Sequence, residues 1–425
     1  MTHAHAPTRA VLLSIGDELL LGEIVDTNMP FIARHLRELG ILVIGTETVG
    51  DELPDIRAVF ERAIARGDLV VATGGLGPTE DDLTLAALAA ALGVELEFRS
   101  EVLDQMAERL KRSVSSFSAS NRKQACLPKG AEILRNDWGT APGVHCRAAG
   151  GQHIFLMPGV PREMEGLLRE RILPYLRTQV PSGQAVVLKI LHAFGIPESI
   201  VGERLHARMQ AGQNPDVGTR VGGGIVTVRL VAHGPTLESA QAVLAPALEQ
   251  VRAALQEGLF GEDEQTLAGA TLAALKSAGK TVAIAESCTA GLVAARLAEA
   301  PGASAALLEG AVVYSNAAKI RTCGVKPETL SVHGAVSAQT AGELALGIRL
   351  RAKADLGVSV TGIAGPDGGT PSKPVGLVYF GVATEKGVQT LERHYPGLAR
   401  NTLRDRVAMQ ALDLLRRAAL EENQL

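Results

Sequence analysis

The sequence has few of the features that mark secreted, membrane-spanning or nucleic-acid-binding proteins. Its four cysteines form no CxxC pair, so neither a disulfide framework nor a zinc site is expected. No stretch approaches about 18 uncharged apolar residues, and the first residues, MTHAHAPTRA, lack the apolar segment of a signal peptide. The net charge is -4 and the basic residues are dispersed, which argues against nucleic acid as the main ligand. These absences together predict a cytoplasmic protein with reduced thiols.

The amino-acid composition is that of an α/β protein. Hydrophobic residues make up 46% of it, charged residues 21% and aromatic residues 3%, and the 425 residues predict two to three domains. Between residues 10 and 180, short β-branched runs alternate with helical periods, which is typical of βαβ units around a parallel sheet. A Pro-Ser-Gly-Gln linker at 181–184 precedes a small unit of strands and helices. A Gly- and acid-rich segment at 258–266 then introduces another α/β region.

A glycine-rich loop near the amino terminus predicts a phosphate site. The loop, TGGLGPTEDD at 73–82, follows a buried strand and precedes an apolar helix, whose first N–H groups attract anions. It lacks the Lys-Ser/Thr ending of a Walker loop. The acids of this loop, Glu80 to Asp82, have two interpretations. They stabilise the helix dipole, or with Asp17 and Glu18 they hold Mg²⁺ or Mn²⁺ beside a phosphate.

A second candidate site lies in the carboxy-terminal region, where AESCTAG (285–291) joins a strand to a helix. Ser287, Cys288 and Thr289 can each cap that helix. Cys288 is also a candidate nucleophile, because a thiol is more nucleophilic than a hydroxyl and a helix terminus lowers its pKa. A histidine partner for it, His333 or His394, stays open. The residue types alone do not separate Ser287 from Cys288.

Two further segments carry groups that suit such a site. In YSNAAK, Lys319 stands four or five residues after Ser315 and Tyr314, so a helical segment brings them towards one pocket. A desolvated lysine activates serine in Ser-Lys hydrolases, whereas a lone lysine is by default a solvated surface residue. The loop TGIAGPDGGTPSKPVG (361–376) stands between two strands and predicts an ordered anion loop, which Arg400 is placed to complete.

Four separated motifs of the amino-terminal region resemble the CinA family of competence- and damage-inducible proteins. They are GDELLLGEIVDTN, TGGLGPTEDDLT, NRKQACLPKGAEILRNDWGTAPG and MPGVPREME. The resemblance implies a molybdopterin-binding fold and a pyrophosphatase that acts on ADP-ribose with a divalent metal (Mg, Mn or Co) and potassium. By position it implies that Asp17 and Asp82 serve the metal. It assigns the phosphates and the pocket rim to Gly74, Gly75, Gly77, Thr79, Gly159 and Glu163.

The three carboxy-terminal motifs resemble the same family over about 160 residues. The implied activity is hydrolysis of nicotinamide mononucleotide to the nicotinate mononucleotide and ammonia. The resemblance makes Ser287 the nucleophile, Lys319 its base and Tyr314 a proton relay. It assigns the nucleotide to Thr289, Asn316, Thr361, Gly365, Gly368, Gly369 and Arg400. The sequence departs from the family at Ala290, where the family usually has Gly.

The prediction for the whole chain is therefore an α/β protein with three domains. These are a molybdopterin-binding-like parallel-sheet domain (8–180), a small α+β connecting domain (185–257) and a carboxy-terminal α/β amidohydrolase domain (262–422). The expected partners are small nucleotides and a second copy of the chain in a homodimer, without a membrane. Two alternatives remain: a nucleotide-sensing adaptor linked to competence or DNA damage, and a protein that handles molybdopterin. The adaptor needs the glycine loops but not Ser287 together with Lys319.

Overall fold

The computed structural model of the chain describes residues 8–179 and 185–420, so the expected linker at 181–184 lies outside the described residues. Contacts divide the chain into two compact units. One holds residues 1–188 and 231–245, and the other holds residues 189–230 and 246–425. Within the described ranges, no helix combines the length and apolar character that a membrane crossing requires.

The amino-terminal domain is built on a six-stranded sheet of order β2-β1-β3-β8-β7-β6. The first four strands in this order are parallel, and β7 and β6 are antiparallel additions at one edge. The strands are β1 (Arg9–Ile15), β2 (Leu42–Val49), β3 (Leu69–Thr73), β6 (Glu132–Leu134), β7 (Gly143–Arg147) and β8 (His153–Met157). A separate antiparallel pair joins β4 (Leu96–Phe98) and β5 (Cys126–Pro128).

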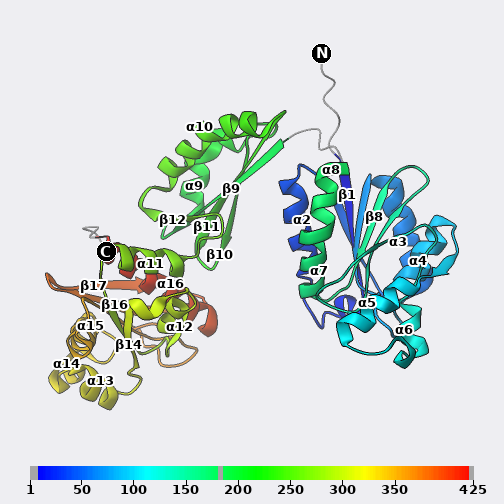
Figure 1. Cartoon of the computed structure of the whole chain (residues 1–425). Coiled ribbons are helices and arrows are strands. Elements are labelled where there is room, and N and C mark those ends of the chain that lie inside the picture. Colours follow the sequence, from blue (N-terminus) through cyan, green and yellow to red (C-terminus); the bar gives the residue numbers. More distant parts are fainter. Residues whose placement is uncertain (1–7, 180–184, 421–425) are drawn as a thin grey trace. The chain divides into compact units, whose positions relative to one another are not determined.

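Helices cover both faces of this sheet (Figure 1). The cause is visible in β1, where Val11 and Leu13 enter one core while Ala10 and Leu12 enter the other, so neither face can stay in water. One face is covered by α3 (Leu53–Arg66), α4 (Thr84–Leu92) and α5 (Ser100–Leu110), and the other by α2 (Asn28–Glu38), α7 (Pro161–Leu167) and α8 (Leu173–Gln179). Two short helices, α1 (Asp17–Leu20) and α6 (Ala119–Lys123), lie in loops.

A small four-stranded sheet of order β10-β11-β9-β12 follows. Its elements are β9 (Ala185–Phe194), α9 (Glu198–Leu205), β10 (Asp216–Gly222), β11 (Ile225–Gly234), α10 (Leu237–Leu255) and β12 (Leu259–Glu262). The sequence indicated β9, β11 and both helices, but it did not indicate β10 or β12, which both contain glycine. Because β12 pairs with β9, part of the expected boundary segment 258–266 belongs to this sheet.

The carboxy-terminal domain has a five-stranded sheet of order β14-β13-β15-β16-β17. The sequence predicted all five strands: β13 (Val282–Glu286), β14 (Leu307–Val312), β15 (Leu356–Gly362), β16 (Leu377–Thr384) and β17 (Gly387–His394). The first three in spatial order are parallel, and β16 and β17 are antiparallel. The carboxyl ends of β14, β13 and β15 therefore meet at one edge, which is where open α/β sheets bind ligands.

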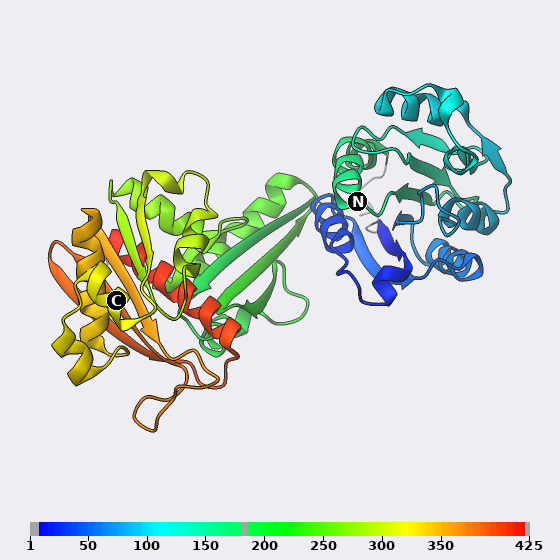
Figure 2. The ribbon, with the colours of Figure 1, turned by 90° about the horizontal axis from the view of Figure 1, so that it is seen from below.

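Helices also sandwich this second sheet, because Val282 and Ile284 of β13 enter one core and Ala283 and Ala285 enter the other. One face is covered by α11 (Leu267–Ser277), α12 (Leu292–Ala298) and α16 (Arg400–Ala419). The opposite face is covered by α13 (Asn316–Cys323), α14 (Pro327–His333) and α15 (Ala338–Ala352). Figure 2 shows α16 as the long red helix along the sheet and the 361–376 segment as an orange loop that projects from the domain.

Candidate functional site

Ser287 and Lys319 meet at the carboxyl edge of the second sheet. Ser287 directly follows β13, and its N–H donates to the Val360 carbonyl of the neighbouring strand (2.9 Å). Lys319 lies in α13, and its Nζ lies 3.2 Å from Oγ of Ser287. The two residues are 32 positions apart in the chain, so the sheet rather than local geometry brings them together. This pair matches the predicted nucleophile and base.

Lys319 is a buried lysine, not the solvated one that its residue type suggests by default. Its side chain is 1% exposed, and Nζ lies 2.9 Å from the Val313 carbonyl and 3.2 Å from the Tyr314 carbonyl. Burial lowers the pKa of Lys319 below the usual lysine value, because a charged amine loses its hydration there. A lowered pKa increases the neutral fraction that a general base requires.

Cys288 is unsuited to be the nucleophile. It is 5% exposed and belongs to the hydrophobic core beneath the sheet. Burial raises the pKa of its thiol to about 12, so the reactive thiolate is scarce at neutral pH. His394, one of the partners left open, lies on β17, where its Nε2 contacts the Val375 carbonyl instead. The residue types left Ser287 and Cys288 tied, and in the structure it is Ser287 that contacts the Lys319 amine while the Cys288 thiol belongs to the core.

Tyr314 occupies a different position from the one expected for a proton relay. Its side chain is 56% exposed, and its hydroxyl accepts a hydrogen bond from Nη2 of Arg400 (3.1 Å). Only the backbone carbonyl of Tyr314 contacts Lys319. Ser315, the alternative to Tyr314, caps α13 by accepting from the Ala318 N–H (3.1 Å). The tyrosine hydroxyl thus lies beside the Arg400 guanidinium and not beside the Lys319 amine. Ser315 has a structural role as the cap of α13.

Arg400 connects the 361–376 loop to Tyr314. Its Nη1 donates to the Gly365 carbonyl (2.6 Å), and Gly365 has the positive φ of 71° that favours glycine. Thr361, at the end of β15, is buried and donates its hydroxyl hydrogen to the Ala335 carbonyl (2.7 Å). Both contacts therefore hold the amino-terminal part of the loop. Gly368 also has a positive φ, of 88°.

The other residues predicted to contact the nucleotide differ in their exposure and packing. Thr289 is completely buried, and its hydroxyl has no hydrogen-bond partner among the described residues. Asn316 is exposed as the first residue of α13. Gly369 is required by packing, since a Cβ there would lie 2.9 Å from the Val375 backbone nitrogen. Asn316 and Gly369 are therefore exposed to a ligand, whereas Thr289 is not.

Two residues that the sequence did not indicate support the turn that carries Ser287. Glu286 is 1% exposed, and its carboxylate accepts hydrogen bonds from three backbone N–H groups at the start of α12. Arg404 of α16 donates from Nη2 to the Thr289 carbonyl (2.9 Å) across 115 positions of sequence. An acidic residue at the end of a fully buried strand was the one signal available for Glu286. No feature of the sequence around Arg404 indicated its contact with the turn.

The departure from the family at Ala290 has a structural consequence. Ala290 is exposed and has a φ of 52°, in the left-handed region that favours glycine. We expect Ala290→Gly to stabilise the protein by about 0.5 to 1 kcal/mol, because relief of strain exceeds the added freedom of the unfolded chain. Urea unfolding measures this. The matched control Ala295→Gly, on an exposed helical position of α12, should destabilise by a similar amount. Loss of stability in Ala290→Gly would contradict the strain.

The glycine loop of the amino-terminal domain is tightly packed against its own chain. A Cβ on Gly74 would lie 2.0 Å from the Ile15 carbonyl oxygen, and one on Gly75 would lie 2.2 Å from the Thr84 hydroxyl. A Cβ on Gly77 would lie 2.5 Å from a carboxylate oxygen of Asp82. Internal packing therefore accounts for all three glycines. It leaves their predicted phosphate contacts without independent support.

Asp82 braces this loop. Its carboxylate accepts from the N–H groups of Gly77 and Thr79 (both 2.7 Å) and from the Thr79 hydroxyl. Helix α4 begins only at Thr84, so Glu80, Asp81 and Asp82 precede it, and the interpretation that they lie in its first turn is wrong. The acids are turn residues, because the loop closes on Asp82 before the helix starts.

A cluster of acids gathers near the carboxyl ends of the parallel strands. Asp17 accepts the Asp51 N–H (3.1 Å) while Asp51 accepts the Asp17 N–H (2.9 Å). Burial raises the pKa of the Asp51 carboxyl, and the nearby carboxylates of Asp17, Glu18 and Asp81 raise it further. Asp82 is not among the carboxylates that act on Asp51. No three metal-binding side chains in residues 8–179 and 185–420 are arranged to hold an ion by themselves.

The predicted rim residues of the amino-terminal site also have partners. Glu163 accepts a hydrogen bond from the side-chain amide of Asn136 (2.7 Å), and the Gly159 carbonyl accepts one from the amide of Asn28 (2.7 Å). Gly159 lies in the loop that follows β8, and Glu163 lies in the first turn of α7, at the same carboxyl end of the sheet. Neither contact by itself implies a ligand.

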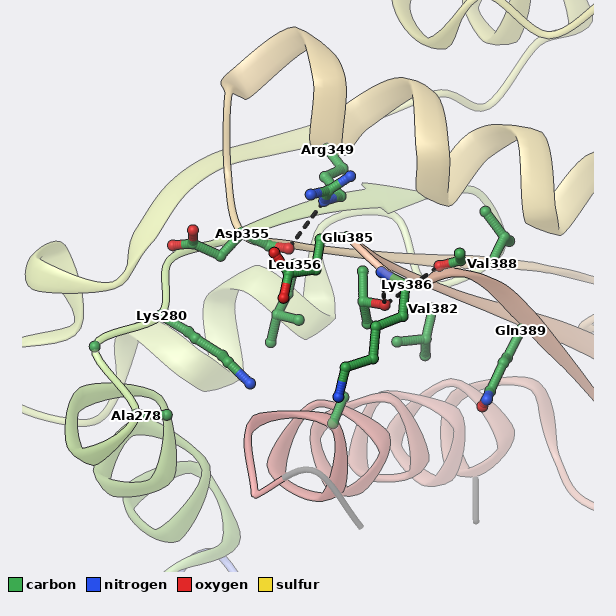
Figure 3. Close-up of a pocket in the computed structure, with 14 residues that line it drawn as sticks. Ala278, Lys280, Arg349, Asp355, Leu356, Val382, Glu385, Lys386, Val388 and Gln389 are labelled. Atoms are coloured by element: carbon green, nitrogen blue, oxygen red, sulfur yellow. Dashed lines mark hydrogen bonds between the residues drawn. The ribbon is translucent and has the colours of Figure 1, made fainter. Parts of the chain in front are cut away.

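A cavity of about 610 Å³ lies elsewhere in the carboxy-terminal domain (Figure 3). Arg349, Asp355 and Leu356 line it together with the β16–β17 turn, and neither Ser287 nor Lys319 does. Leu356 begins β15 whereas Thr361 is near its end, roughly 17 Å along the strand. The cavity is therefore at the amino edge of the sheet, opposite the Ser287 site.

Comparison with known proteins decides the family. Three family models match successive parts of the chain: a probable molybdopterin binding domain over 11–178, the damage-inducible protein CinA KH domain over 188–261 and the CinA C-terminal domain over 264–419. A CinA-like protein of Kosmotoga olearia is 40% identical over 414 residues, or 97% of this chain and 99% of that protein. The chain belongs to the CinA family.

Other members of the CinA family show similar agreement. A putative competence-damage inducible protein of Clostridium novyi is 40% identical over 417 residues, which cover 97% of this chain and 99% of that one. A solved CinA structure from Thermoplasma acidophilum is 35% identical over 39% of this chain and 98% of its own, with a TM-score of 0.37. The family models confirm the predicted class: a molybdopterin-binding-like α/β domain, a small connecting domain and an α/β CinA domain.

Proposed function

We propose that the carboxy-terminal domain hydrolyses the carboxamide of nicotinamide mononucleotide, with Ser287 as nucleophile and Lys319 as general base. The observation that carries the proposal is the buried amine of Lys319, 3.2 Å from the Ser287 hydroxyl. A protein that merely senses a nucleotide gains nothing from a desolvated lysine against a serine. Groups with a shifted pKa beside a candidate nucleophile are instead typical of catalytic sites.

The three contacts of Lys319 suit a neutral amine. A neutral amine has two N–H bonds and one lone pair, and the carbonyls of Val313 and Tyr314 accept the two hydrogens. Nζ lies within hydrogen-bond distance of Ser287 Oγ (3.2 Å), so in the neutral amine the lone pair is left to accept the hydroxyl hydrogen of Ser287. The two carbonyls thus fix the orientation in which Lys319 acts as a base, which is the role that a third residue has in hydrolytic triads.

The reaction has two halves. Oγ of Ser287 attacks the carboxamide carbon as its proton passes to Nζ of Lys319, and the resulting ammonium returns a proton to the departing nitrogen, which leaves as ammonia. Water then attacks the acyl ester and gives one proton to Lys319, which returns it to the Ser287 oxygen. The products are ammonia and the nicotinate mononucleotide, and the enzyme is restored.

We place the nucleotide phosphate beside Arg400, at the 361–376 loop. A guanidinium has five N–H donors, and the described contacts of Arg400 use one for Gly365 and one for Tyr314. The remaining donors suit a phosphate, which guanidinium binds in bidentate fashion. The Tyr314 hydroxyl, held by the same arginine, is then a contact to the substrate and not a relay to Lys319.

For the amino-terminal domain we propose metal-dependent hydrolysis of ADP-ribose. The acids at the strand ends support it, because Mg²⁺ is commonly held by one or two carboxylates together with substrate phosphates. Asp17 and Asp51 are the residues placed to hold such an ion, and the ion would offset the charge of the phosphates. Asp82, whose carboxylate accepts three hydrogen bonds, would shape the loop around them.

One experiment with the full-length protein tests both activities. Nicotinamide mononucleotide should yield ammonia and the nicotinate mononucleotide in equal amounts, and ADP-ribose should yield AMP when Mg²⁺ or Mn²⁺ is present. Chelation with EDTA should abolish AMP release and leave ammonia release unchanged, since no metal takes part in the Ser287 chemistry. Absence of ammonia release from the folded protein would reject the amidase. AMP release that survives chelation would reject the metal-dependent step.

A further inference from the structure

Glu286 is a buried acid that the proposed chemistry does not use. It ends β13, one residue before Ser287, and is 1% exposed. Its Oε2 accepts from the N–H groups of Gly291 and Val293 (both 3.0 Å), and its Oε1 accepts from the Ala294 N–H (2.9 Å). A buried carboxylate with three N–H partners is strongly held, because the charge is solvated by the backbone instead of by water.

These bonds close a small loop around the nucleophile. The side chain of Glu286 reaches forward to the start of α12, so residues 287–290 form a turn whose two ends are joined. The Val313 N–H holds the Glu286 carbonyl (2.7 Å), and the turn also includes Ala290 with its strained φ of 52°. A strained residue persists only where its surroundings hold it in place. Glu286 supplies that constraint from inside the turn.

Because of these bonds, the first N–H groups of α12 are not available to bind an oxyanion. Glu286 occupies those of Gly291, Val293 and Ala294, and the Leu292 N–H donates to the Thr289 carbonyl (3.3 Å). Within the turn, the Ala290 N–H donates to the Ser287 carbonyl (3.1 Å). The N–H groups of Cys288 and Thr289 have no backbone acceptor in the described chain. They are the backbone donors left for an oxyanion beside Ser287.

We propose that Glu286 is the positioning residue of this turn: it holds Ser287 against Lys319 and leaves the Cys288 and Thr289 amides for the oxyanion. The inference rests on the proposed function, since it assumes that Ser287 is the nucleophile. Glu286 does not touch the substrate in this role. Its loss should therefore lower kcat and leave KM nearly unchanged, because an interaction that matters only in the transition state is removed.

The test compares Glu286→Gln with Glu299→Gln, a matched control on an exposed acid just beyond α12. Glutamine keeps the size of Glu286 but replaces one acceptor by a donor that faces an N–H group. We expect kcat for nicotinamide mononucleotide to fall by about 30-fold or more, with KM within about threefold. Ala290→Gly added to Glu286→Gln should restore part of kcat, because glycine adopts the turn without strain. The control should retain wild-type kinetics.

A second measurement separates this inference from the proposed function. A fluorophosphonate probe labels an activated serine without any need for the natural substrate, and its rate on Ser287 should fall with Glu286→Gln as kcat does. Labelling that slows in the variant, in a protein that releases no ammonia, would support the positioning role and reject the amidase. Unchanged kcat and labelling, or a rise in KM alone, would overturn the positioning role. If Glu286→Gln does not fold, Glu286→Asp, which keeps the buried charge on a shorter side chain, takes its place under the same criteria.

Discussion

Ser287→Ala should lower kcat for ammonia release by at least about 10³-fold, while the protein stays folded. Ser287 lies at the edge of the sheet, and its hydroxyl contacts only Lys319 among the described side chains. Removal of one oxygen therefore disturbs little packing. The expected loss is large because, among the described residues, Ser287 supplies the one side-chain hydroxyl hydrogen-bonded to the Lys319 amine. Ammonia release under substrate saturation, with thermal unfolding as the check on folding, measures the effect.

The matched control is Cys288→Ala, one residue further along the same turn. Because the Cys288 thiol is buried and burial raises its pKa to about 12, we expect kcat to change by less than about tenfold. The cost should instead appear as a loss of stability of about 1 kcal/mol from the deleted sulfur in the core. The assignment of the nucleophile would be wrong if Cys288→Ala lost ammonia release and Ser287→Ala retained it.

The five strands of the carboxy-terminal domain were predictable from their local sequence, whereas their order in the sheet was not predicted. Runs such as LGVSV and VGLVYFGVAT are β-branched and uninterrupted, as strands covered on both faces require. The sequence did not indicate β10, in which two glycines weaken the strand pattern, or β12, which has only four residues. The acids of the amino-terminal loop failed for another reason. The helix that seemed to begin at them begins two residues later, after the turn that Asp82 closes.

The candidate site was predictable in its parts but not in its geometry. Spacing in YSNAAK placed Lys319 on a helix beside the sheet edge, yet only the fold shows it buried against Ser287. Ser287 and Cys288 are both buried, and what favours Ser287 is its contact with Lys319, a tertiary property. Arg404 lies 115 residues from Thr289 in the sequence, and no local sequence pattern predicts such a contact. Glu286 is the second residue of AESCTAG, but its three backbone partners become apparent only once α12 is in place.

The second large effect concerns Lys319→Met, which removes the amine and keeps an unbranched side chain of similar length. We expect kcat/KM to fall by about 10² to 10⁴-fold, the usual contribution of a general base. In the wild type, kcat/KM should rise with pH until Lys319 is neutral and then level off. Because burial lowers the pKa of Lys319, this plateau should begin below the ordinary lysine value of about 10.4. The control Lys326→Met, on an exposed lysine just after α13, should keep the wild-type profile.

The free energy of unfolding should also depend on pH through the titration of Lys319. Between the lowered pKa of folded Lys319 and the ordinary value of the unfolded chain, the unfolded state binds more protons, so the free energy of unfolding rises with pH. Below that window both states carry the charge, and the burial penalty is felt in full. The slope due to this one group approaches about 1.4 kcal/mol per pH unit, and Lys319→Met should remove it while Lys326→Met should not. Urea unfolding of the three proteins at several pH values measures the difference. Equal slopes in wild type and Lys319→Met would mean that Lys319 titrates as an ordinary lysine, and the neutral base on which the proposed amidase depends would then be absent at neutral pH.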